Sequence, residues 1–270
     1  MQEMDNKVMI SVAPVAATEK EIIPEKIAKD VLACYQAGAA MVHLHVRDRE
    51  GRLTPDMGLL EETLRLIRRD SDIILEVSTG GVSDLTIQER CAPLYSDLVE
   101  ACSLNVGSTN LGKAVYCNPI DDVEYCVGEI LKQKKTPEVE TFEIGHTWTM
   151  QKLMERYDFV EPVLFSIVLG HEGEAPATPE ALSHMISMIP KKAIWGITHA
   201  NRRDFSLIAG AVGMGAKTVR IGFEDSRYLD RDTIVETNAP LVEKTARLLR
   251  AMDKEPMTPA EARALFRIGR

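Results

Sequence analysis

The sequence predicts an α/β fold in which eight parallel strands close into a barrel, and three observations support this. Short β-branched or apolar runs alternate with amphipathic stretches along all 270 residues, as parallel strands joined by crossover helices do. Eight such units in about 250 residues match the count and length of a (β/α)8 barrel. The turn after the first strand, residues 13–18, lacks the glycines that an open doubly wound sheet normally carries there. We therefore expect a TIM barrel.

The strands are expected where Val, Ile and other apolar residues form short runs. In chain order these runs span residues 8–12, 40–45, 73–77, 98–104, 139–144, 163–169, 193–198 and 218–222. No linker, repeat or low-complexity segment separates them. We therefore expect a single domain over residues 1–270.

The helices are expected where apolar residues recur every three or four positions. These stretches span residues 24–36, 59–69, 87–94, 121–134, 149–157, 179–189, 202–214 and 238–252. An extra C-terminal helix over residues 258–266 opens with Thr258, Pro259 and Glu261, which combine an N-cap, a proline at N1 and a capping glutamate at N3. Thr178 and Pro179 open the sixth helix in a similar way.

The composition excludes several classes of function. The chain is 45% hydrophobic and 27% charged, with a net charge of −9, and no basic run suggests binding to nucleic acid or to a membrane surface. Its apolar runs are far shorter than the roughly 20 residues of a membrane helix, and the polar N-terminus does not resemble a signal peptide. The five cysteines are odd in number and form no Cys-x-x-Cys, which is typical of reduced thiols. We expect a cytoplasmic homo-oligomer, a dimer or a tetramer.

Histidines gather where the strands of the barrel are expected to end, the face on which such barrels carry their active sites. Five of the six histidines fall there, namely His43, His45, His146, His171 and His199. Only His184, within the sixth helix, does not. Carboxylates accompany them, with Glu138, Glu140 and Glu143 on the fifth strand and Glu224 and Asp225 on the eighth.

His43 and His45 are spaced so that both side chains point the same way from a strand. Two imidazoles directed into a barrel mouth form half of a divalent-metal site. The alternative is one buried histidine bonded to a backbone carbonyl and a second facing solvent. Spacing leaves the third ligand open between Glu224 and Asp225, which are costly to bury unpaired.

Arg220 lies four residues before Glu224, within the last strand. A barrel-facing arginine must find an anion, either one of these acids or a substrate carboxylate. The lysines Lys7, Lys192 and Lys217 lie at strand starts, opposite the expected active site. Imine catalysis, which needs a lysine in the mouth, is therefore not indicated.

Five motifs in order give the chain a resemblance to a known family. They read VHLHVR at residues 42–47, STGG at 78–81, LNVGS at 104–108, PEVE at 137–140 and RIGFED at 220–225. Together they resemble the β-keto acid cleavage enzymes, zinc-containing TIM barrels that convert a β-keto acid and acetyl-CoA into acetoacetate and a new acyl-CoA. The resemblance covers essentially the whole chain.

The resemblance implies roles for particular residues. His43, His45 and Glu224 would bind one zinc ion per chain. Asp225 would be the general base and Arg220 a polarising, anion-binding residue. The substrate site would comprise Ser78, Ser108, Asn105, Glu140 and Glu143.

Two loops bear on the substrates that the resemblance implies. His171 and Glu172 are expected to shape the pocket for the acyl group. The phosphates of acetyl-CoA need cations, for which Arg202 and Arg203 after the seventh strand are the candidates.

Two other functions compete with this one. Amidohydrolase barrels also use a His-x-His, here joined by His146, His171 and Asp225, although theirs lies on the first strand. A metal-binding barrel without catalysis would leave Asp225 and Arg220 unexplained.

Overall fold

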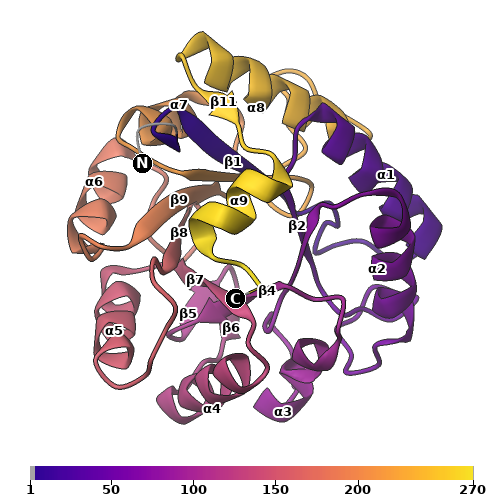
Figure 1. The fold of residues 1–270 in the computed structure, drawn as a ribbon, viewed down its shortest axis with the longest axis vertical. Helices are drawn as coiled ribbons and strands as arrows, with labels where there is room; N and C mark the ends of the chain where they lie inside the picture. Colours follow the sequence, from indigo (N-terminus) through magenta and orange to yellow (C-terminus); the bar gives the residue numbers. More distant parts are fainter. Residues whose placement is uncertain (1–3, 270) are drawn as a thin grey trace.

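The strands of the computed structural model, which describes residues 4–269, close into a parallel barrel. In barrel order they are β1 (Lys7–Val12), β2 (Met41–Leu44), β3 (Ile74–Val77), β4 (Ala101–Asn105), β7 (Thr136–Thr141), β8 (Leu164–Leu169), β9 (Ile194–His199) and β10 (Thr218–Ile221). β10 pairs with β1 in parallel, so the sheet has no free edge within the barrel. The ring is visible in Figure 1, and it confirms the predicted (β/α)8 fold.

Helices cover the outside of the ring (Figure 1). They are α1 (Pro24–Ala37), α2 (Gly58–Asp70), α3 (Ile87–Arg90), α4 (Ile120–Lys132), α5 (Ile144–Met154), α6 (Pro179–Met188), α7 (Ser206–Gly213) and α8 (Ala239–Ala251). A further helix, α9 (Pro259–Phe266), lies elsewhere. None of the helices within residues 4–269 is long and apolar enough to cross a membrane.

The extra C-terminal helix closes the end of the barrel where the strands begin. Figure 1 shows α9 lying across the middle of the ring. Its side chain Phe266 packs in an apolar cluster with Met9, Met41 and Ile74. The predicted capping box is present: the Thr258 side chain accepts from the Glu261 amide at 3.2 Å, and Glu261 accepts from the Thr258 amide at 2.8 Å. With this end plugged by apolar side chains, the opposite end is left for chemistry.

The barrel interior becomes polar toward the carboxyl ends of the strands. His43, Glu76, Glu138 and Arg220 are all buried there. Glu76 lies opposite His43 in the β2–β3 register. Burying charged groups is costly unless they pair with one another, so this interior is built for function rather than for stability.

Four elements differ most from the sequence prediction. The fifth helix begins at Ile144 instead of residue 149. The fifth barrel strand ends at Thr141 rather than residue 144, and Glu143 is the N-cap of α5. The third helix breaks after Arg90, and a 3₁₀ turn (Ala92–Tyr95) follows because Pro93 has no amide hydrogen to continue an α-helix. The seventh helix begins at Ser206 instead of residue 202.

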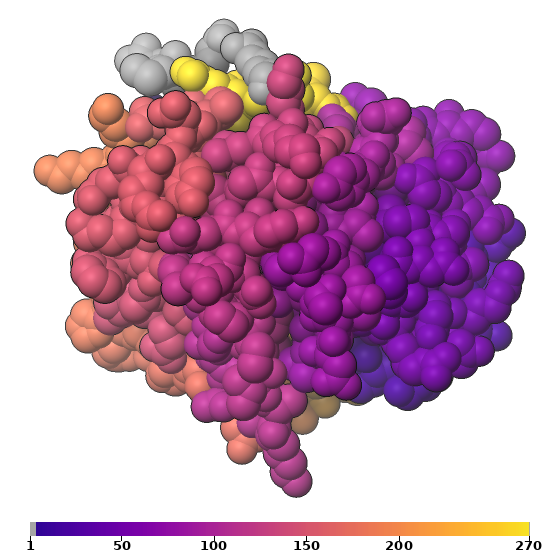
Figure 2. Space-filling model, turned by 90° about the horizontal axis from the view of Figure 1, so that it is seen from below, coloured from indigo at the N-terminus to yellow at the C-terminus, as the bar shows by residue number. Residues whose placement is uncertain are grey.

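Two short features were not predicted. Strand β11 (Glu255–Pro256) pairs in parallel with the first two residues of β1, Lys7 and Val8. A hairpin, β5 (Thr109–Leu111) and β6 (Ala114–Tyr116), follows β4 and turns at Gly112, whose φ of +61° suits glycine. In Figure 2 a magenta projection, the colour of this part of the chain, extends on the side opposite the yellow C-terminal helix. The hairpin thus belongs to the face on which the strands end.

Candidate active site and metal centre

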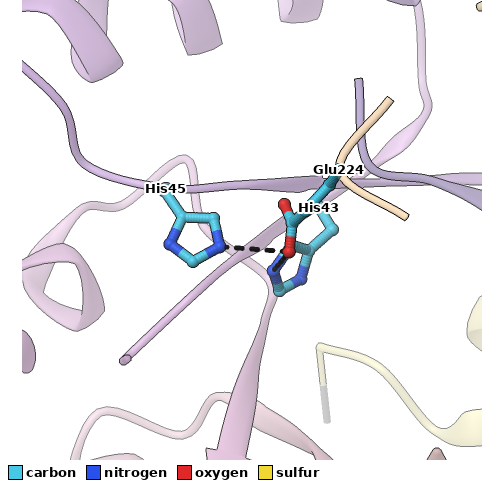
Figure 3. Close-up of side chains that lie close together, drawn as sticks. All are labelled: His43, His45 and Glu224. Carbon is cyan, nitrogen blue, oxygen red and sulfur yellow. Dashed lines mark hydrogen bonds and ion pairs between the residues drawn. The ribbon is translucent and has the colours of Figure 1, made fainter. Parts of the chain in front are cut away.

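Three side chains from two segments converge at the mouth of the barrel. His43 is on β2, His45 follows that strand, and Glu224 follows β10. Their ligand atoms all lie within 4.8 Å of one another. Nε2 of His45 is 3.3 Å and Nε2 of His43 is 4.0 Å from the same Glu224 oxygen. Figure 3 shows both imidazoles directed at this carboxylate.

The donor set fits a zinc ion. Two imidazole nitrogens and one carboxylate are ligands of catalytic zinc sites, which keep a further position for water or substrate. His43 Nδ1–H donates to Glu76 Oε2 at 3.1 Å, which leaves Nε2 directed at the triad. A carboxylate behind a histidine is the usual support of a metal ligand.

Glu76 and Glu138 form a buried pair beneath the triad. Burial raises the pKa of Glu76 to about 8, and burial together with the neighbouring Glu76 raises the pKa of Glu138 well above its usual range. Near neutral pH at least one of the two carboxyls therefore keeps a proton and can donate it in a hydrogen bond to the other.

Arg220 is held by carboxylates on three sides. Its guanidinium contacts Glu140 at 2.7 Å, Asp225 at 2.8 Å and Glu224 at 3.4 Å. Its Nε also donates to Asp225 at 3.2 Å, so the contact with that carboxylate is two-pronged. The sequence left two possible partners for Arg220, the neighbouring acids or a substrate carboxylate. In the structure Arg220 pairs with the acids.

These charges determine the ionisation of the site. Burial alone would raise the pKa of Glu224, but His45 and Arg220 outweigh it and hold that pKa well below its usual range. Burial alone would lower the pKa of Arg220, but its three carboxylates raise that pKa well above normal. Glu224 is therefore an anion, as a metal ligand must be.

The triad opens into a cavity of about 770 Å³. Loops from several strand ends contribute to its wall. The lining includes His43, His45, Arg47, Ser78, Glu140, Phe142, His171, Glu172, Arg220 and Glu224. This volume suits a small molecule with a flexible arm.

The other predicted site residues differ in how close they come to the cavity. Ser78 and Glu140 line it, whereas Asn105, Ser108 and Glu143 are not among the lining residues. Asn105 is buried at the end of β4, and neither atom of its side-chain amide has a hydrogen-bond partner within residues 4–269. The Ser108 hydroxyl accepts from the Asn118 amide at 2.7 Å. Glu143 is exposed because its strand ends two residues earlier.

The remaining histidines do not join the metal triad. His146 lies in α5, where its Nδ1 accepts from the Phe142 amide at 3.3 Å and its Nε2 is 3.4 Å from the Ser108 carbonyl oxygen. Burial lowers the pKa of His171, which lines the cavity as a neutral imidazole. The hydrolase alternative requires His146, His171 and Asp225 to bind metal together. Among residues 4–269 these three do not form a group that could hold a metal ion.

The two arginines proposed for CoA phosphates have different environments. Arg202 is only 1% exposed, donates to the Tyr228 carbonyl at 2.7 Å and stacks 4.0 Å from the Phe205 ring centre. It is therefore closed to a phosphate. Arg203 is exposed, stacks on Tyr228 and lines a second cavity of about 420 Å³. Asn201 lines both this cavity and the larger one.

Sequence reasoning missed two groups around the triad. The support of His43 by Glu76 follows only from the β2–β3 register, which no motif reveals. Tyr116 lines the cavity from the unpredicted hairpin. A Cβ added at Gly80 would lie 1.4 Å from the Tyr116 hydroxyl oxygen. This close approach explains why glycine occupies position 80, after β3.

A comparison with protein families agrees with this geometry. The sequence model of the beta-keto acid cleavage enzymes matches residues 7–268, nearly the whole chain. The chain belongs to this family. It is therefore an enzyme, and the resemblance stated from the motifs is confirmed.

Curated relatives match most of the chain. The 3-keto-5-aminohexanoate cleavage enzyme of Fusobacterium nucleatum is 31% identical over 90% of this chain and 88% of its own. The 3,5-dioxohexanoate:acetyl-CoA acetone transferase of Paraburkholderia graminis is 28% identical over 97% of this chain and 96% of its own. The family thus includes enzymes named for different keto acids.

A solved structure agrees on the fold. The apo structure of ObcA superposes with a TM-score of 0.75 at 19% identity and covers 92% of this chain. This chain spans 65% of the length of ObcA. The likeness supports the barrel and nothing finer.

Proposed function

We propose that this protein is a zinc-dependent β-keto acid cleavage enzyme that condenses a β-keto acid with acetyl-CoA to give acetoacetate and a new acyl-CoA. The observation that carries the proposal is the His43–His45–Glu224 triad at the cavity of a family member, beside Arg220, which lines the same cavity and pairs with the buried Asp225. Neither a hydrolase nor a binding protein accounts for both features.

His43, His45 and Glu224 would hold one zinc ion per chain, with Glu76 fixing the His43 ring. When bound, zinc supplies Lewis acidity that stabilises negative charge on the ketone and carboxylate oxygens of the substrate. The residues around it then need only to hold the keto acid and to move one proton.

Asp225 is proposed as the general base and Arg220 as the group that orients it. Asp225 removes a proton from the carbon between the ketone and the carboxylate. That carbon attacks the thioester carbonyl of acetyl-CoA, and the CoA thiolate leaves. The thiolate then adds to the original ketone, and cleavage of the adjacent carbon–carbon bond releases acyl-CoA and acetoacetate, to which the proton returns.

The substrate site is proposed around Ser78 and Glu140, which line the cavity, together with Asn105, Ser108 and Glu143, which do not line it. His171 and Glu172 line the part proposed for the acyl group. Arg203 is proposed to bind the phosphates of acetyl-CoA, because Arg202 is buried.

One assay tests the proposed function. The metal-loaded protein is incubated with acetyl-CoA and each member of a panel of β-keto acids, and acetoacetate and acyl-CoA are quantified. We expect both products in equal amounts with at least one keto acid. Hydrolysis of substrate without acetyl-CoA, or a binuclear metal content, would contradict the proposal.

We also propose a cytoplasmic homo-oligomer, a dimer or a tetramer. Ile144 and Trp148, one helical turn apart on α5, are 43% and 56% exposed, and an exposed apolar pair of this kind is typical of contact surfaces. Light scattering of the wild type and of Trp148→Glu tests the assembly. All five cysteines are free thiols, which supports a reducing compartment.

A further inference from the structure

Arg47 is a buried cation that the proposed mechanism does not use. It follows His45 by two residues, lines the large cavity and is only 8% exposed. Its Nη1 donates to the Gly51 carbonyl at 2.6 Å, and its Nε has no hydrogen-bond partner among the residues that the structure describes. Nη1 is thus already engaged and Nε is shielded, which leaves Nη2 as the donor that can first meet a ligand in the cavity.

The two arginines of the cavity differ in how their charge is balanced. Arg220 contacts three carboxylates within 3.4 Å. No carboxylate of residues 4–269 lies within 4.0 Å of the Arg47 guanidinium. Burial lowers the pKa of Arg47 although the charges of Glu224 and Glu19 oppose this from a longer distance. A buried charge without a close partner is costly, so an anion that arrives with a ligand would stabilise this guanidinium.

The loop around Arg47 fixes its direction. Gly51 has φ +81°, and a Cβ there would lie 1.9 Å from the Glu19 carbonyl oxygen. The loops after β1 and β2 therefore press against each other just where the Gly51 carbonyl holds Arg47. A binding group whose orientation is set before the ligand arrives loses little entropy on binding.

The chemistry of Arg47 favours a carboxylate over a phosphate of CoA. A planar guanidinium matches a carboxylate in a two-pronged contact. Lys20 and Arg52, the other cations of this wall, are exposed at the rim, where a large, hydrated phosphate could reach them. Arg47 lies deeper, beside the triad at which the keto acid is proposed to react.

We propose that Arg47, rather than Arg220, binds the carboxylate of the β-keto acid. The assignment rests on the proposed function for the identity of the ligand. Arg220, already paired with three acids, serves to orient Asp225.

Binding measurements without acetyl-CoA test this assignment. Calorimetry compares acetoacetate, itself a β-keto acid, with its neutral analogue acetoacetamide on the metal-loaded wild type and on Arg47→Gln. We expect the variant to bind acetoacetate about 10- to 100-fold more weakly, as for loss of a charge-assisted hydrogen bond, and acetoacetamide within about threefold of the wild type. Arg47→Lys, which keeps the charge without the fork, should lose less.

Arg52→Gln is the matched control, because Arg52 lines the same cavity but is exposed and paired with Asp48 at 2.7 Å. It should leave both affinities unchanged. Equal weakening of both ligands by Arg47→Gln, or unchanged acetoacetate binding, would overturn the assignment. If Arg47→Gln does not fold, Arg47→Lys provides the same comparison. Because no turnover is measured, failure of the proposed transferase reaction would be seen separately in the product assay.

Discussion

Glu224 and Asp225 are neighbours in the chain and both contact Arg220, but only Glu224 also contacts the histidines. Glu224 lies 3.3 Å from His45, whereas both oxygens of Asp225 face Arg220. Consecutive side chains diverge where a strand turns into its loop. The two acids therefore cannot do the same work, and conservative substitutions should separate them.

We expect Asp225→Asn to fold, keep its zinc and bind keto acid almost normally, while kcat falls roughly 10²–10⁴-fold because the base is removed. Glu224→Gln should instead lose zinc. Elemental analysis and steady-state kinetics on both variants check this. If Asp225→Asn sheds zinc while Glu224→Gln retains it, the roles are exchanged. Full activity of Asp225→Asn would move the base to Glu140, which lines the cavity.

Glu76 gives a second prediction at the residue scale. It holds Nδ1 of His43 at 3.1 Å, and loss of such a partner typically costs 10- to 100-fold in metal affinity. Glu76→Gln should weaken zinc binding by about that factor in a chelator competition, and His43→Ala should abolish stoichiometric binding. Glu138→Gln is the control, since Glu138 is buried nearby without contacting His43. Equal losses in the two glutamate variants would mean that the effect is on the buried pair rather than on the ligand.

Among the elements, the loops carry most of what the sequence did not predict. Strand and helix periodicity located the barrel, but the hairpin after β4 lies in a segment without a strong pattern, and its Tyr116 lines the cavity. The fifth strand was placed three residues late, so Glu143 was expected in the mouth and is instead an exposed N-cap. Period-2 patterns are short, and a small shift at a strand end changes which residue reaches the site.

The loop between β9 and α7 gives a prediction about acetyl-CoA. Arg203→Ala should raise the KM for acetyl-CoA several-fold at low ionic strength, with a smaller effect at high salt because an exposed charge is screened. Lys192→Ala, at the opposite end of β9, should change neither value. The KM for the keto acid should stay constant in both. An unchanged acetyl-CoA KM in Arg203→Ala at low salt would place the phosphates elsewhere.

At the scale of the whole molecule, the sequence predicted which residue types meet at the mouth but not how they pair. His43, His45 and Glu224 were identifiable because strand ends of a barrel converge. Register and loop paths determine how Arg220 pairs with its acids, why Arg47 has no close carboxylate among the described residues, and how Glu76 contacts His43. These are set by packing across the barrel, between segments up to about 180 residues apart, such as His45 and Glu224.

Buried acids also make the stability of the molecule depend on pH, and Glu174 offers a clean test. It lies in the loop after β8 with both carboxylate oxygens shielded and without a hydrogen-bond partner among residues 4–269. Burial, with Glu140 and Glu143 nearby, raises its pKa from 4.5 to about 8. The folded protein thus holds a proton that the unfolded chain releases between these values, so the contribution of Glu174 to stability is present below pH 4.5 and is lost as the pH rises toward 8.

Glu174→Gln removes this titration. We expect wild type and variant to have similar free energies of unfolding near pH 5, and the variant to become the more stable of the two by pH 8.5, with a difference that grows by at most about 1.4 kcal/mol per pH unit. Urea unfolding across this range measures it. Glu172→Gln, in the same loop but exposed, should show no such trend. A difference between wild type and Glu174→Gln that is constant with pH would mean that Glu174 is already ionised in the folded protein at pH 5, and that the acids at the barrel mouth do not raise its pKa.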